Sequence, residues 1–180
     1  LISLQTGATV SPEPELTNLE ISQVQQLLLE SAPSNPTSPG IQHVILTREQ
    51  LDILLRYSIE LVDISPPLAA QVSLAEENLT IQLSAQLNDT FIPLYLNLTA
   101  EFLQVDEQLD LQALYMGKLK LPAGLLRYFR QQIQDQYLAS NPYYQDFNEL
   151  LSNIQSVNLS QRLVDVELQW EPALVSRIGD

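Results

Sequence analysis

The chain has 180 residues, a net charge of −14 and a pI near 4.2. This acidity argues against binding to a nucleic-acid backbone, which requires clustered Lys and Arg. The absence of Cys excludes disulfides, thiol catalysis and cysteine zinc sites. Because 45% of the residues are apolar, the chain can form a hydrophobic core. We expect an N-terminal arm or linker over residues 1–16 and a single domain over residues 17–180.

The first predicted helix begins after Thr17, because Thr17 and Glu20 have the spacing of a capping box. An apolar stripe then runs along one face of the helix, and the helix is expected to end near Ser31. The following segment, residues 32–40, contains three prolines and a glycine and is typical of a loop.

A short strand is predicted at Val44–Leu46, and it leads directly into a second helix. Thr47 is the expected N-cap of this helix, and Gln50 is the partner that completes the box. Leucines at helical spacing predict that the helix runs to about Tyr57.

The central part of the chain alternates strictly between apolar and polar residues. Three long strands are expected, and short polar turns rich in Asn, Asp and Glu separate them. This pattern predicts an antiparallel meander with one buried face and one wet face. The expected strands cover residues 79–87 and 94–102, and another begins at 109–113 and runs toward Met116. Before them, Val72 and Leu74 alternate with polar or small residues in the same way.

Beyond the meander, Gly117 is expected to bend the chain, and Pro122 opens an amphipathic helix that reaches Tyr137. Asn141 caps a further helix whose apolar stripe ends at Ile154. A last strand is predicted at 164–170. The fold class is therefore α+β: a curved antiparallel sheet of about five or six strands wrapping amphipathic helices.

No catalytic, phosphate-binding or metal-binding motif occurs in the chain. The single histidine, His43, has no Cys or second His near it in sequence, and we interpret it as a structural or surface residue. The acidic pairs Glu76–Glu77 and Asp106–Glu107 lie at turns and are expected to be solvated. We therefore expect a protein that is not an enzyme and that has no metal and no cofactor.

Four Asn-x-Ser/Thr triplets begin at Asn78, Asn88, Asn97 and Asn158. They are glycan acceptors if the protein is secreted by a eukaryote, or else ordinary polar strand and turn residues.

Four of the eight basic residues fall within thirteen positions, at Lys118, Lys120, Arg127 and Arg130. This cluster is either a patch for an anionic group, such as a lipid headgroup or an acidic protein surface, or a solvated strand and helix face.

The order of these segments resembles a known family. The resemblance rests on ILTREQLDILL at 45–55, FIPLYLNLTAEF at 91–102, GKLKLP at 117–122, IQSVNL at 154–159 and the last strand ending in Trp170. In these features the chain is similar to the YpmS-like proteins of the bacterial envelope, a family of unknown function that resembles the tubular lipid-binding (TULIP, BPI-like) architecture. The resemblance implies a curved sheet around a long helix and an apolar tunnel.

Two functions remain open. The first is a non-enzymatic extracytoplasmic protein, periplasmic or envelope-associated, that holds a lipid or other apolar ligand between sheet and helices. An N-terminal segment upstream of residue 1, removed from this sequence, would anchor it to the membrane. The alternative is a structural or protein-interaction module of the envelope with no ligand cavity. The candidate ligand-binding residues are Leu83, Leu96, Leu98, Phe102, Leu126, Phe129 and Ile133, with Lys118, Lys120 and Arg127 at the headgroup.

Overall fold

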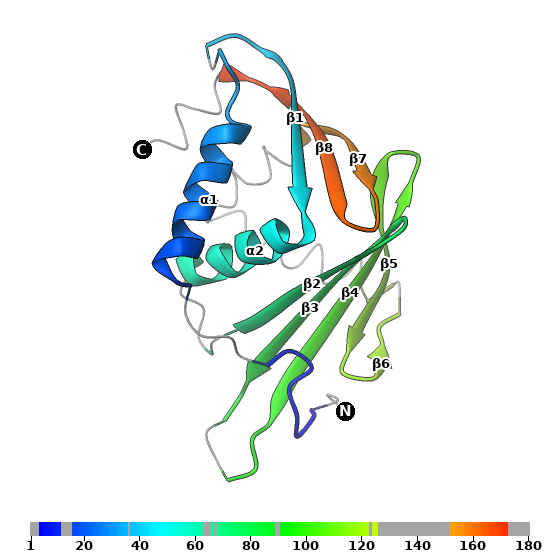
Figure 1. The fold of residues 1–180 in the computed structure, drawn as a ribbon. Helices are drawn as coiled ribbons and strands as arrows, with labels where there is room; N and C mark the ends of the chain where they lie inside the picture. The colour runs from blue at the N-terminus through cyan, green and yellow to red at the C-terminus, as the bar shows by residue number, and fades with distance from the viewer. Residues whose placement is uncertain are drawn as a thin grey trace.

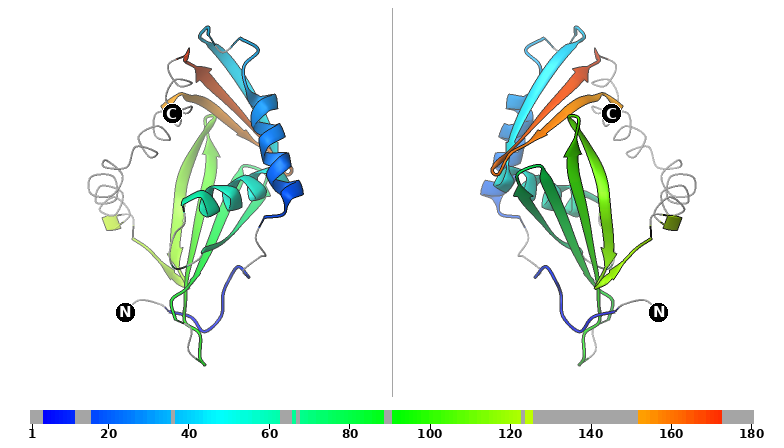
Figure 2. Two further views of the ribbon diagram at one scale, coloured as in Figure 1. Left: turned by 90° about the vertical axis from the view of Figure 1, so that its left-hand side faces the viewer. Right: turned by 90° about the vertical axis from the view of Figure 1, so that its right-hand side faces the viewer.

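The structure is a computed structural model that describes residues 4–11, 16–35, 37–62, 66, 68–88, 91–122, 124–125 and 152–172. Within these residues the fold is α+β, with two helices and two antiparallel sheets. The sheets lie one above the other in Figure 1, and the two side views show both helices on the same side of them (Figure 2). The predicted fold class is confirmed.

Helix α1 (Asn18–Ser31) begins at the predicted cap. The Thr17 hydroxyl accepts a hydrogen bond from the Glu20 amide, and the Glu20 carboxylate accepts one from the Thr17 amide. Val24 and Leu27 of the predicted stripe are buried. The capping box and both predicted ends of this helix are therefore confirmed.

Helix α2 (Arg48–Val62) follows strand β1 (Gly40–Thr47) without a linker. Thr47 and Gln50 exchange reciprocal hydrogen bonds of 2.8 and 3.1 Å, which confirms the second predicted cap. The helix continues five residues past the predicted end at Tyr57.

The larger sheet is a meander of five strands in the order β2-β3-β4-β5-β6, and every pair is antiparallel. The predicted meander is confirmed, including the alternation of Val72 and Leu74 in β2, and the two-residue β6 extends it at the other edge. The strands are β2 (Leu68–Ala75), β3 (Asn78–Gln86), β4 (Tyr95–Val105), β5 (Gln108–Met116) and β6 (Leu119–Lys120).

A β-bulge interrupts the pairing of β4 with β5. Glu101 pairs with Ala113 but Phe102 pairs with Leu111, so that Gln112 is the extra residue. Because a bulge inserts one extra residue, the side chains beyond it switch to the opposite face from the one that simple alternation predicts. Leu114 and Met116 therefore lie on one face together with Leu111, although their spacing breaks simple alternation.

The smaller sheet has three strands in the order β1-β8-β7, formed by β1, β7 (Ile154–Leu159) and β8 (Leu163–Trp170). The last strand was predicted, but its pairing with β1 in a separate sheet was not. Ile154 was predicted in a helical stripe, and this is wrong: it begins β7 and pairs with Leu168.

The two sheets meet at the turn between β4 and β5. The Gln104 side chain accepts a hydrogen bond from the Leu159 amide and donates one of 3.1 Å to the Asn158 side chain. The Val157 amide also donates to the Glu107 carbonyl oxygen, 2.7 Å away. A single polar side chain on the larger sheet thus binds two residues of β7.

Helix α2 packs against β2, the first strand of the meander. The Asp52 carboxylate accepts a hydrogen bond of 2.8 Å from the Val72 amide. An edge strand exposes unpaired amides that favour aggregation. The Asp52 carboxylate accepts a hydrogen bond from one of these amides and thereby links the helix to the edge of the sheet.

The helix predicted to open at Pro122 appears in the described residues only as Gly124 and Leu125, where the Leu125 amide donates to the Pro122 carbonyl oxygen. The remainder of this helix and the one predicted after Asn141 lie outside the described residues.

Candidate functional site

The four predicted apolar ligand-binding residues that the structure describes share one face of the meander. Leu83 pairs with Leu98, and Leu96 lies opposite Ala85. Phe102 lies opposite Leu79, so that its side chain is on the same face. The alternation of β3 and β4 therefore brings together Leu83, Leu96, Leu98 and Phe102, as predicted. We call this side of the sheet the apolar face.

The large side chains of the apolar face are only partly covered. Eleven of them are half-buried, and none is buried to the extent of a core residue. On β2, in contrast, the smaller side chains of Ala70 and Val72 are buried where α2 packs. The half-buried residues are Leu68, Leu74, Leu79, Ile81, Leu83, Leu96, Leu98, Phe102, Leu109, Leu114 and Met116.

The predicted basic residues do not all join the apolar face. Lys120 lies opposite Tyr115, and its Nζ is 5.7 Å from the centre of the Tyr115 ring, on the opposite side of the sheet. Lys118 is exposed in the tight turn that Gly117 makes at φ 59°. Leu126, Arg127, Phe129 and Ile133 lie outside the described residues.

The opposite, polar face carries a buried hydrogen-bond network that holds the N-terminal arm. Ser84 and Asn97 pair across β3 and β4 and are 3% and 2% exposed. The Ser84 hydroxyl donates to Asn97 Oδ1 (2.6 Å) and accepts from the Val10 amide (2.9 Å). Asn97 Nδ2 donates to the Gly7 carbonyl oxygen (2.9 Å). The arm is thus fixed through its main chain.

Further contacts extend this arm across the sheet. Gln5 forms an antiparallel bridge with Tyr95 at the start of β4, and its side chain accepts from Asn97 Nδ2. The Thr9 amide donates to Asn97 Oδ1 (3.0 Å), and the side chain of Val10 is buried. Simple alternation predicts that Ser84 and Asn97 face solvent. The structure instead buries both side chains beneath the arm, and no sequence pattern indicated this network.

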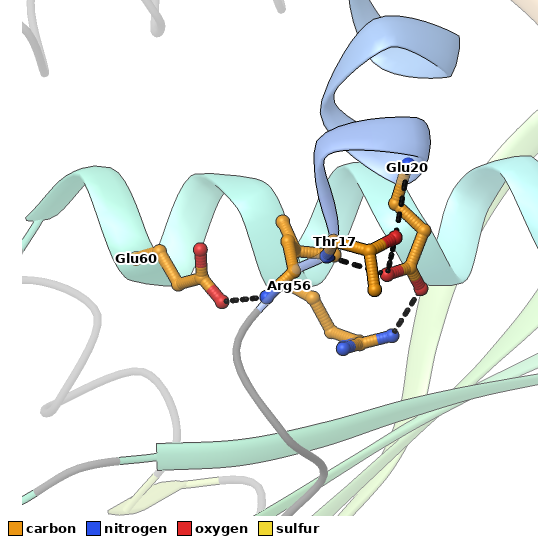
Figure 3. A network of polar contacts seen from close by, with 5 residues as sticks. Thr17, Glu20, Arg56 and Glu60 are labelled. Carbon is orange, nitrogen blue, oxygen red and sulfur yellow. Dashed lines mark hydrogen bonds and ion pairs between the residues drawn. The ribbon is translucent and has the colours of Figure 1, made fainter.

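A second polar network joins the start of α1 to α2 (Figure 3). The Arg56 guanidinium donates to Glu20 Oε1 at 3.1 Å, and this arginine side chain is only 13% exposed. The Leu16 amide donates to Glu60 Oε1 at 3.0 Å. Hydrogen bonds from Thr17, together with Arg56, hold the pKa of the Glu20 carboxyl below its ordinary value of 4.5.

His43 is on the surface, on the outer face of the smaller sheet. Its Nδ1 is 3.6 Å from Asp165 Oδ1, and its Nε2 is 3.4 Å from Glu167 Oε2. Its neighbours on the same face of β1 are the exposed Ile41 and Ile45. Within the described part of the chain, no group of three His, Asp or Glu residues could hold a metal ion.

Three hollows lie away from the apolar face. One, of about 270 Å³, lies between α1 and α2 and includes Gln23, Leu27 and Ile53 in its lining. Two larger and more open ones, of about 570 and 470 Å³, surround the turn between β7 and β8 near Arg162. Carboxylates and amides contribute to the lining of all three.

Comparison with known proteins found no family model, no curated protein and no solved structure that matches this chain. None of the helices in the described residues combines the length and apolar character that a membrane span needs.

Proposed function

We propose that this protein is a non-enzymatic, extracytoplasmic protein of a bacterial envelope that holds a lipid or other apolar ligand against the apolar face of its meander. One observation carries the proposal: eleven large apolar side chains share this face and remain half-buried among the described residues. A packed module would bury such side chains to native density, whereas a binding surface leaves them for the ligand.

The chemistry of the face suits an acyl chain. Its central residues are aliphatic, and the small Ala100 lies between Ile81 and Leu114 on the neighbouring strands. Burial of apolar area contributes about 25 cal/mol per Å², so that covering about 200 Å² of ligand and sheet stabilises the complex by about 5 kcal/mol. Helix α2 at the β2 side would form one wall of the site.

The resemblance to YpmS-like and tubular lipid-binding proteins supports the same proposal and its location in the envelope, with an upstream membrane tether.

One observation favours a protein-interaction module instead. Strand β1 is an edge of the smaller sheet, and its outward-facing Ile41 and Ile45 are each 58% exposed. An exposed edge of this kind can accept a strand from a partner protein. In this alternative the apolar face would be covered within the protein, and no ligand would be bound.

Native mass spectrometry of gently purified protein separates the two functions. We expect an adduct of lipid mass that denaturing extraction releases, and we expect the L83N/L98N variant to lose it. The matched control, L163N, changes an exposed leucine of β8 and should keep the adduct. An apo mass that does not increase on incubation with bacterial phospholipids would instead establish the interaction module.

A further inference from the structure

The loop between β3 and β4 ends in exposed apolar side chains. Phe91 is 102% exposed and Ile92 is 60% exposed, and Leu87 at the base of the loop is also exposed. Soluble proteins rarely leave several large apolar side chains together in water without a partner. Asp89 and Thr90 of this loop lie outside the described residues.

The base of this loop is well defined by hydrogen bonds. The Leu87 amide donates to the Leu94 carbonyl oxygen (2.8 Å), and the Leu94 amide donates to Asn88 Oδ1 (2.7 Å). The Gln86 side chain donates to the Asn88 carbonyl oxygen (2.8 Å). A closed hairpin base therefore presents Phe91 and Ile92 at the far end of the sheet.

The meander places its turns alternately at its two ends. The β3–β4 loop and the β5–β6 turn lie at one end, where the N-terminal arm also pairs with β4, as Figure 1 shows. We call this end of the molecule the tip. It carries five of the exposed large apolar residues: Leu4, Leu87, Phe91, Ile92 and Leu119.

The two ends differ in charge. At the tip, among the described residues 4–11, 84–88, 91–98 and 115–122, the charged side chains are Lys118 and Lys120, both exposed. The turns at the opposite end carry the exposed carboxylates of Glu76, Glu77, Asp106 and Glu107. Among these described residues the tip is therefore basic, whereas the chain as a whole is acidic, and Asp89 adds one carboxylate to the sequence of the loop.

We propose that the tip docks on an anionic lipid bilayer, with Phe91 and Ile92 inserted at the interface and Lys118 and Lys120 facing the headgroups. Exposed aromatic and aliphatic side chains next to lysines are the chemistry that binds such a surface. Repulsion from the acidic turns at the far end is weak, because salt screens charges beyond about 8 Å at physiological ionic strength. The proposal goes beyond the carriage of an apolar ligand and does not depend on it.

The test is flotation of the protein with vesicles of phosphatidylcholine and phosphatidylglycerol. We expect the wild type to float with the vesicles and F91S/I92S to bind about tenfold less or weaker still. K118E/K120E should lose binding that depends on phosphatidylglycerol. The matched control, L19S/L29S, removes two apolar side chains of α1 that are 70% and 77% exposed, and it should bind like the wild type.

Two further readouts keep the test decisive. Phe91 and Ile92 are exposed, so F91S/I92S should keep the circular dichroism spectrum and the lipid adduct of the wild type. Wild-type protein that stays off the vesicles, or F91S/I92S that floats unchanged, overturns the proposal. A wild-type dimer that F91S/I92S converts to a monomer, without vesicle binding, would make the tip a protein interface and overturn it as well.

Discussion

Asn97 begins an Asn-Leu-Thr triplet, yet its side chain is buried beneath the N-terminal arm and every donor and acceptor of its amide is used. Glycan attachment requires an exposed side chain, so this triplet is structural in the folded protein. Asn78 and Asn158 are exposed, but Asn158 accepts a hydrogen bond from Gln104 at the contact between the sheets. Similar triplets in the sequence thus have different roles in the fold.

Replacing Asn97 by alanine should destabilise the protein by about 2–4 kcal/mol, because it leaves the buried Ser84 hydroxyl without its acceptor and removes the side-chain hydrogen bonds that join the sheet to the N-terminal arm. Urea unfolding followed by circular dichroism measures this change. The control, N78A, removes one exposed turn hydrogen bond and should cost less than about 0.5 kcal/mol. Equal effects of the two substitutions would contradict the role of the network.

Both helix starts follow directly from the sequence, because a capping box depends only on residues three positions apart. Thr17 with Glu20 and Thr47 with Gln50 form the predicted reciprocal bonds. The cap of α1 also contacts α2 through Arg56, which is far away along the chain. No local pattern predicts that contact.

The Glu20 carboxyl has a lowered pKa, so it stabilises the fold above pH 4.5, and this contribution is lost as the pH falls through the lowered value. E20Q should therefore cost about 1 kcal/mol near pH 7 and progressively less in acid. The melting temperature measured from pH 3 to pH 7 should show the two curves converging at low pH. T17A keeps the hydrogen bond from the Thr17 amide, which is the main cause of the shift, and removes only the one from the hydroxyl, so its curve should approach that of the wild type only in part. Parallel curves for E20Q and the wild type would contradict this assignment.

In strand β5 the alternating pattern predicts the orientation of the first side chains correctly but fails after the bulge. Leu109 and Leu111 alternate as expected, but Ala113 lies on the polar side, opposite Glu101, because Gln112 bulges out. The shift in phase from Leu111 to Leu114 was visible in the sequence, and a bulge explains it. An alternating pattern of apolar residues extended from Leu109 to Ala113 does not predict the bulge.

At the scale of the whole molecule, the sequence predicted β8 and the second half of β1, but neither β7 nor the arrangement of these strands in one sheet. Val44 pairs with Val166, and residues so distant along the chain meet only in the tertiary structure. The hairpins of the meander, in contrast, pair neighbours in sequence and were predicted. The apolar face followed from that alternation, while the tip depends on the relative placement of loops and turns.

Gln104 joins the two sheets, so Q104A should leave the Leu159 amide without its acceptor and destabilise the contact by about 1–2 kcal/mol. We expect faster hydrogen exchange at Leu159 and a broader urea transition, because the smaller sheet would open before the meander. The Q108A control changes an exposed glutamine at the start of β5 and should leave both unchanged. A sharp transition and unchanged exchange in Q104A would show that other contacts couple the sheets.

The attachment of the N-terminal arm has a consequence for how related sequences diverge. Ser84 and Asn97 bind main-chain atoms of Gly7, Thr9 and Val10, and these atoms are the same whatever side chains the arm carries. Substitutions at a position such as Thr9 should therefore accumulate freely during evolution, while the Ser–Asn pair on the sheet is retained. The invariant part of this attachment would then lie mainly in the receiving strands, and within the arm only Gln5 and Val10, whose side chains also take part, should be constrained.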